Sequence, residues 1–341
     1  MDNLVLFNKN DLKILLKNRQ GESKFGKHIR LLSNFNNIYD SIVNLDVRYV
    51  IFGIKEDVGV FANYGNLGAS RAWDATLNAL LNIQSNSFTQ PNKVLLLGHL
   101  DYSISLEKLK ELDQSNKKHI AKARKMTAKI DHDVSALVYQ IVKAGKIPIV
   151  IGGGHNNAYG NIKGTSLALN KAINAVNFDA HSDFRAEEGR HSGNGFSYAH
   201  HEGFLNQYFV FGLHENYTSE GVFKTLNKNK SVSYNTFESI GVRRELKFSA
   251  ELERAMAFVA NSPFGIELDC DAIRNIPSSA MTPSGFSVNK ARRFVNYFSG
   301  CENVSYLHIC EASPTPETEA QVGKLISYLI TDFIRANARL N

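Results

Sequence analysis

Three polar segments of the chain contain residue types that bind divalent metal ions. The first is Gly152-Gly153-Gly154-His155, a histidine that follows three glycines. The second is Asp179-Ala180-His181-Ser182-Asp183, and the third is Asp269-Cys270-Asp271. In an extended chain alternate side chains point the same way, so the acids and the imidazole of the last two segments are expected on a common side. Carboxylates this close repel one another unless a cation lies between them.

These segments supply six candidate metal ligands: His155, Asp179, His181, Asp183, Asp269 and Asp271. Four carboxylates and two imidazoles suit a pair of hard-to-borderline cations such as Mn²⁺, whereas a structural Zn²⁺ would favour thiolates. Two such ions about 3.5–4 Å apart can lower the pKa of a shared water toward neutrality, which provides a nucleophile for an electrophilic carbon. Taken alone, the first segment is more often a tight turn with a satisfied histidine, and the second could be a solvated polar turn. The three together favour a binuclear metal hydrolase.

An apolar run precedes each of these segments, and such runs are typical of buried strands. Ile147–Ile151 leads to His155, Ile173–Phe178 to the second segment, and Phe264–Leu268 to the third. A fourth run, Val304–Ile309, leads to Cys310-Glu311. Ligands of open parallel sheets bind beyond the carboxyl ends of the strands. We therefore expect the four chain segments to meet at one edge of a sheet.

The rest of the chain predicts an α/β fold. Further strand candidates are Val47–Ile54, Val94–Gly98, Phe209–Gly212 and, more weakly, Ser231–Tyr234. An apolar stripe from Ile130 to Ile141 predicts a helix that ends at Gly145, and a second helix is expected around Thr318–Arg335. Repeated strand–helix alternation predicts a mostly parallel sheet covered on both faces. Without a linker-like segment, residues 41–341 are predicted to form a single domain, with residues 1–40 as an N-terminal appendage.

Composition is that of an ordinary soluble protein, with 43% hydrophobic and 21% charged residues among 341. No apolar run approaches the ~20 residues that cross a bilayer. The N-terminus lacks a basic region before an apolar stretch, as a secretory signal would have, and the three cysteines lack metal-finger spacing. These absences predict a cytoplasmic protein with no membrane partner.

The net charge is +6, and residues 117–130 contain six basic residues and no acid. Four of these, Lys118, Lys122, Lys125 and Lys129, fall on one helical face. A nucleic-acid contact is the alternative, but no stacking aromatics interleave the charges. A solvated helix surface is favoured, and no nucleic-acid partner is expected.

The motifs, in this order, resemble those of the ureohydrolase (arginase/agmatinase) superfamily from about Gly53 to the C-terminus. The resemblance implies two Mn²⁺ per subunit, one bound by His155, Asp179, Asp183 and Asp269 and the other by Asp179, His181, Asp269 and Asp271. It places Glu311 against the amidine or guanidine nitrogens of the substrate. It also implies a three-layer α/β/α fold with a mostly parallel eight-stranded sheet, and a homo-oligomer.

Details within the superfamily are most similar to the formimidoylglutamase branch. These details are the segments Gly152–Gly160, Asp183–Arg185, Ser192–Phe196 and Asn63–Ala69. Arginases and agmatinases usually have Gly-Gly-Asp-His at the first segment, and arginases keep a proton-relay histidine at the position of Phe196. Asn66 and Asn156 stand where that branch would have arginine and glutamate, and these two differences bear on the substrate rather than on the metal site.

The resulting hypothesis is hydrolysis of N-formimidoyl-L-glutamate to L-glutamate and formamide. Asp183 would relay a proton to the departing amine, and Glu311 would orient the amidine. Arg185 would pair with a substrate carboxylate, with Asn194 as a second substrate contact; the alternative for Arg185 is an ion pair with Glu187 or Glu188. Two other functions remain open: a guanidino hydrolase that releases urea, and a non-catalytic metal-dependent binding protein.

Overall fold

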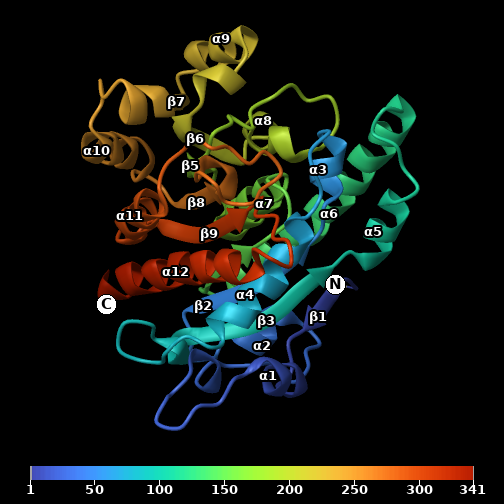
Figure 1. Cartoon of the computed structure of the whole chain (residues 1–341), viewed down its shortest axis with the longest axis vertical. Coiled ribbons are helices and arrows are strands. Elements are labelled where there is room, and N and C mark those ends of the chain that lie inside the picture. Colours follow the sequence, from blue (N-terminus) through green and yellow to red (C-terminus); the bar gives the residue numbers. More distant parts are fainter. Residues whose placement is uncertain (1, 341) are drawn as a thin grey trace.

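The computed structural model describes residues 2–340 and shows a central sheet with helices on both faces (Figure 1). In this part of the chain nine strands form one sheet, in the order β1-β3-β2-β4-β9-β8-β5-β6-β7. The strands are β1 (Leu4–Leu6), β2 (Tyr49–Lys55), β3 (Val94–Asp101), β4 (Ile147–Ile151), β5 (Ile173–Phe178), β6 (Leu205–Leu213), β7 (Val232–Thr236), β8 (Phe264–Asp269) and β9 (Val304–Cys310). All neighbours are parallel except β1 and β3, which confirms a mostly parallel α/β sheet.

The prediction of eight strands is wrong by one. Each of the eight expected runs forms a strand, and the ninth, β1, comes from the segment predicted to be an appendage. It pairs antiparallel with β3, with Leu4 opposite Leu100 and Leu6 opposite Gly98. Three residues are too few to show a strand period in the sequence, and β1 is held by its pairing with β3. The N-terminal segment therefore completes one edge of the sheet.

Helices bury alternate residues of the strands on opposite faces. One face is covered by α4 (Ala72–Leu80), α10 (Phe248–Val259), α11 (Val288–Ser299) and α12 (Glu319–Asn337). The other is covered by α2 (Ile38–Ile42), α3 (Val58–Ala62), α6 (Lys117–Lys143), α7 (Asn157–Leu169) and α8 (Gly195–His201). Ile149 and Ile151 join the first core, whereas Val150 joins the second. Burial on both faces explains why the central strands are mostly apolar rather than alternating.

Helix α6 is longer than its apolar stripe. It begins at Lys117, where the side chain of Asn116 accepts a hydrogen bond from the Lys118 amide. It ends at Lys143, just before Gly145, whose φ of 73° suits glycine. None of the described helices is long and apolar enough to cross a membrane.

The carboxyl ends of four adjacent central strands meet at one edge. In the order β4-β9-β8-β5, Ile151 pairs with Ile309, Asp269 with Cys310, and Phe178 with Leu268. The loops that follow these strands must therefore start side by side. This register brings together the three segments with candidate metal ligands and Glu311.

Candidate metal centre

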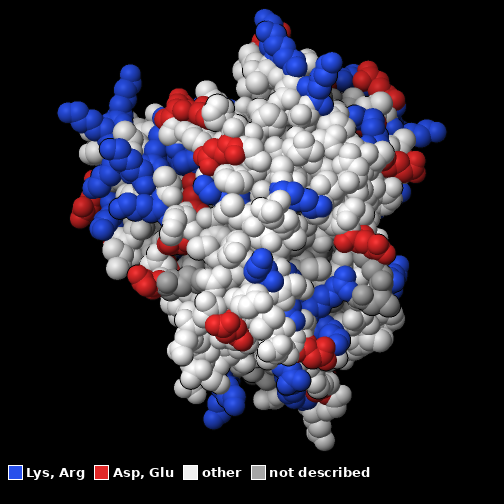
Figure 2. Space-filling model, turned by 180° about the vertical axis from the view of Figure 1, so that it is seen from behind, with Lys and Arg blue, Asp and Glu red and all other residues white. Residues whose placement is uncertain are grey.

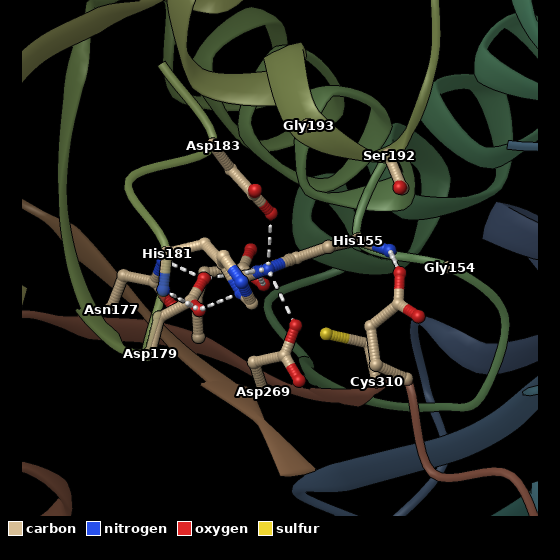
Figure 3. A network of polar contacts seen from close by, with 12 residues as sticks. Gly154, His155, Asn177, Asp179, His181, Asp183, Ser192, Gly193, Asp269 and Cys310 are labelled. Carbon is tan, nitrogen blue, oxygen red and sulfur yellow. Dashed lines mark hydrogen bonds and ion pairs between the residues drawn. The ribbon is translucent and has the colours of Figure 1, made fainter. Parts of the chain in front are cut away.

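The first group of candidate ligands surrounds the imidazole of His155 (Figure 3). Its Nδ1 lies 2.8 Å from Asp183 Oδ2, 3.1 Å from Asp179 Oδ2 and 3.3 Å from Asp269 Oδ2. The four residues are buried, and they come from the loops after β4 and β5 and from the end of β8. One nitrogen thus faces three carboxylate oxygens.

The second group is formed by Asp179, His181 and Asp271. His181 Nδ1 lies 2.9 Å from Asp271 Oδ2 and 3.7 Å from Asp179 Oδ1. Asp179 therefore turns one oxygen toward each group, as a ligand shared by two ions would. Asp269 turns Oδ2 to the first group, and its Oδ1 accepts the amide hydrogen of Asp271 at 2.7 Å.

All six candidate ligands lie together, although simple alternation does not explain how. Residues 179–183 follow β5 as a loop, and Asp183 has a left-handed φ of 43°. Asp179 Oδ1 accepts the amide hydrogen of His181 at 2.7 Å, which is the same local turn that Asp269 makes with Asp271. Two short aspartate turns, rather than extended strands, direct these side chains.

The donor set fits a pair of divalent cations. His155 Nδ1 and Asp271 Oδ1 are buried and have no hydrogen-bond partner in the part of the chain that the structure describes. Burial and the neighbouring Asp179 carboxylate raise the pKa of Asp183 to about 6, and burial with the Asp271 charge raises the pKa of Asp269 well above its usual value. Cations among these groups would satisfy the orphaned atoms and offset the repulsion.

The chain matches the arginase family over residues 48–335. It belongs to the arginase family.

Formimidoylglutamase of Streptococcus pyogenes is 22% identical over 303 residues, which cover 86% of each chain. Among solved structures, formimidoylglutamase from Bacillus subtilis superposes with a TM-score of 0.74 at 17% identity, covering 94% of this chain and 93% of that one. Formiminoglutamase of Trypanosoma cruzi with Mn²⁺ gives 0.72 at 18% identity, covering 93% and 99%. These likenesses confirm the arginase-like fold, and membership of the family makes this chain a hydrolase that acts on amidines.

The loop that carries His155 in this arginase-family protein depends on glycine and on a buried acid that the sequence analysis missed. Gly153 has a φ of 69°, and a Cβ there would lie 2.4 Å from Asn157 Nδ2. Glu56, just after β2, accepts hydrogen bonds from the Gly154 amide at 2.9 Å and from Asn157 Nδ2 at 2.8 Å. An acid directly after a buried strand is the same sequence pattern that marked Asp179.

Glu267 is a second missed residue, and it lies behind the candidate ligand His155. Its Oε2 is 3.4 Å from His155 Nε2 and 2.6 Å from His308 Nδ1, and its Oε1 accepts a hydrogen bond from the Tyr306 hydroxyl at 2.7 Å. A carboxylate on the far nitrogen of a ligand histidine orients the ring and makes it a better donor. The spacing Glu267-x-Asp269 could have indicated it, because alternate strand residues share a face.

Glu311 lies directly beside the His155 loop. Its Oε1 accepts the His155 amide hydrogen at 2.8 Å, and its Oε2 accepts a hydrogen bond from Ser279 Oγ. Burial raises its pKa to about 8, and its φ of 60° is left-handed. Such strained positions occur where surrounding structure fixes a functional side chain.

A cavity of about 570 Å³ opens onto these groups. Six residues predicted for the site line it: His181, Asp183, Arg185, Asp269, Asp271 and Glu311. Arg185 Nη1 donates to Asn63 Oδ1 at 2.7 Å, and Nη2 lies 3.5 Å from Glu188 Oε1, so the ion pair weighed as its alternative is present. Arg185 nevertheless remains on the cavity wall.

Asn194 does not line this cavity. Its Oδ1 accepts hydrogen bonds from Arg190 and from the His191 amide, and its Nδ2 donates to the carbonyls of Ala186 and Gly189. Both ends of its amide are thus used inside the loop. The substrate contact expected of Asn194 stays a prediction, and its present contacts tie together residues 186–194.

Proposed function

We propose that the protein hydrolyses N-formimidoyl-L-glutamate to L-glutamate and formamide with two Mn²⁺ ions. The observation that carries this proposal is the charge arrangement of the cavity. Arg185 offers a cation to a substrate carboxylate, and Glu311 offers an acceptor to the amidine in the same cavity. The similarity to formimidoylglutamases and the Mn²⁺ in the related Trypanosoma cruzi structure support it.

Six residues would hold the metals. His155, Asp179, Asp183 and Asp269 would bind one ion, and Asp179, His181, Asp269 and Asp271 the other. When bound, two such ions lower the pKa of a shared water toward neutrality and so supply hydroxide to the amidine carbon. Glu267 would hold the His155 ring in place through its Nε2.

The remaining roles belong to side chains that face the cavity. Glu311 would accept a hydrogen bond from the amidine nitrogen, because each carboxylate oxygen keeps a free lone pair beside its present partner. A cationic amidine would also favour the ionised form of Glu311. Asp183 would carry a proton to the departing amine. Arg185 would repel the guanidinium of a substrate such as agmatine.

A turnover assay tests the substrate. The Mn²⁺-loaded protein is incubated with formimidoylglutamate, arginine, agmatine and guanidinobutyrate, and formamide, ammonia and urea are measured. We expect formamide and glutamate from the first compound. Urea from a guanidino compound, with formimidoylglutamate left intact, would make the protein a guanidino hydrolase. Metal binding without turnover of any of the four would make it a binding protein.

A substitution tests the role of Asp183. We expect Asp183→Asn to lower turnover at least ~100-fold, because the amide cannot carry the proton. Bound metal is measured in the same sample, which separates loss of proton transfer from loss of the ion. Asp74→Asn, an acid paired with Lys55 outside the site, is the matched control. Near-normal turnover in Asp183→Asn would refute the assigned role.

A further inference from the structure

A second cavity, of about 730 Å³, adjoins the first and shares Tyr64 and Arg185 with it. Its charged lining is strongly basic: Lys117, Arg124, Lys125, Arg185 and Arg190, with Glu188 as the acid among them. Figure 2 shows lysine and arginine side chains gathered at the left of the view, where α5 (Ser103–Leu109) and the first half of α6 lie. The proposed reaction at the metals uses only Arg185 of this set.

Three donors converge on one oxygen of Glu188. Arg124 Nη2 lies 3.0 Å, His191 Nε2 3.4 Å and Arg185 Nη2 3.5 Å from Glu188 Oε1. Arg124 also donates from Nη1 to the Glu188 carbonyl at 2.7 Å. Two guanidinium groups and an imidazole around a single point form a carboxylate-binding arrangement.

His191 is a neutral donor in this arrangement. Its side chain is fully buried, and Nδ1 accepts the Gly193 amide hydrogen at 3.1 Å, so the ring proton is on Nε2. Burial and the charges of Arg185 and Arg124 lower its pKa to about 3. Nε2 has no well-aligned hydrogen-bond partner in the described part of the chain. Leaving a buried N–H without a good hydrogen bond costs free energy, so an acceptor that reaches His191 Nε2 in better alignment would be bound favourably.

The cavity keeps an excess of positive charge. Arg190 is neutralised by buried Asp131, with 2.8 Å between Nε and Oδ2. Lys117 and Lys125 are exposed and form no ion pair with a side chain of residues 2–339. Four cations, Lys117, Arg124, Lys125 and Arg185, therefore share the cavity lining with the single carboxylate of Glu188. Glu188 lies in a loop outside any helix or strand, and its side chain is 45% exposed, so its carboxylate can leave the three donors without disturbing a regular element.

We infer that this cavity binds the carboxylates of an acidic small molecule, and that Glu188 occupies the donors until the ligand replaces it. The inference goes beyond the proposed reaction, because it concerns a second cavity and holds whichever amidine is cleaved. It also gives Arg124 a function that its place on a solvated helix did not suggest.

Calorimetric titration of the Mn²⁺-loaded protein with glutarate tests the inference. Glu188→Gln removes the competing charge and should tighten glutarate binding about tenfold or more, whereas Arg124→Met should weaken it by a similar factor. Lys122→Met removes the same charge from the same helix outside the cavity, and should leave the dissociation constant within about twofold. Lys125→Met changes an exposed residue of the lining and should weaken glutarate binding severalfold. It takes the place of Arg124→Met if the Arg124→Met variant fails to fold.

The kinetics of glutarate inhibition then identify the source of the ligand. Competition with the substrate means that the cavity receives carboxylates of the substrate itself, and a change in kcat without competition means a separate effector; both results support the site. A dissociation constant that is unchanged in Glu188→Gln, Arg124→Met and Lys125→Met, or no binding at millimolar glutarate, overturns it. Glutarate binding is measured directly and does not depend on turnover. A protein that is inactive on formimidoylglutamate but still binds glutarate through Arg124 would therefore contradict the proposed substrate and leave the second binding site standing.

Discussion

The carboxylate of Glu267 should determine how tightly the metal centre holds its ions, although it is not itself a ligand. Burial opposes its ionisation, but His308 and the contact with His155 hold its pKa at about 2. In Glu267→Gln the side chain keeps its size and loses its charge. Both His155 Nε2 and His308 Nδ1 contact Oε2, so the amide oxygen can still face both rings but offers them no charge, and the amide NH2 then meets the Tyr306 hydroxyl that Oε1 accepted from.

The expected magnitude follows from those contacts. A hydrogen bond to a charged group contributes about 1.5–3 kcal/mol, and a lost partner behind a metal ligand costs about 10–100-fold in affinity. The two ranges agree, since each tenfold change corresponds to about 1.4 kcal/mol. We therefore expect Glu267→Gln to weaken Mn²⁺ binding about 10–100-fold. Tyr306→Phe removes one hydrogen bond to Oε1 but keeps the charge, so its effect should be smaller.

The assay is competitive Mn²⁺ titration of chelator-treated protein, with circular dichroism to verify that each variant is folded. If Glu267→Gln does not fold, Glu267→Asp, which keeps the charge but withdraws it by one methylene, takes its place. Wild-type Mn²⁺ affinity in a folded Glu267→Gln variant would refute the reasoning. An equal loss in Tyr306→Phe would show that hydrogen bonding, and not charge, is the cause.

Three further predictions concern stability. Gly153→Ala should lower the free energy of unfolding by about 1–3 kcal/mol, because a left-handed φ and a close contact with Asn157 add together. The control is Gly145→Ala, at φ 73° with open space around it, which should lower the free energy of unfolding by less. Both variants are measured by denaturant titration, and an equal loss of unfolding free energy in the two would contradict this reasoning. Chelation of the metals should lower the thermal midpoint, since an ion at 100 times its dissociation constant contributes about 2.7 kcal/mol; an unchanged midpoint would argue against a bound metal. His191 has its folded pKa lowered to about 3, so below about pH 6.5 the unfolded chain takes up a proton that the folded chain does not, and about 2 kcal/mol of stability is lost by pH 5. His191→Asn should remove that part of the pH dependence, and the same slope in both proteins would count against it.

Much of the sheet could be predicted from the sequence because its strands are buried on both faces. Ile147–Ile151 is apolar throughout and Ile173–Phe178 is apolar apart from two asparagines, and their bounds match β4 and β5. The edge strand Leu4–Leu6 buries one residue of three and depends on pairing with β3, which the local sequence does not show. Strands that form through distant partners leave little local pattern.

In the candidate site, too, residues with a local sequence pattern could be predicted, whereas residues whose contacts come from distant parts of the chain could not. The six candidate ligands were recognisable because polar residues directly after apolar runs are conspicuous. Glu267 was missed because it lies inside such a run, and its meaning depends on His308 of the neighbouring strand, its register partner. Asn194 lies off the cavity because its side chain bonds to Arg190 and to the carbonyls of its own loop, and no residue spacing reveals which way an amide turns.

The left-handed backbone at Asp183 and Glu311 has a consequence for engineering this protein. For L-residues this conformation costs roughly 1–2 kcal/mol, a cost that glycine avoids. Glycine at either position would relax the main chain, but it would delete a carboxylate that the proposed reaction requires. Selection for thermostability alone would thus favour inactive variants at these two sites, so a stabilised and active form must be sought elsewhere in the fold.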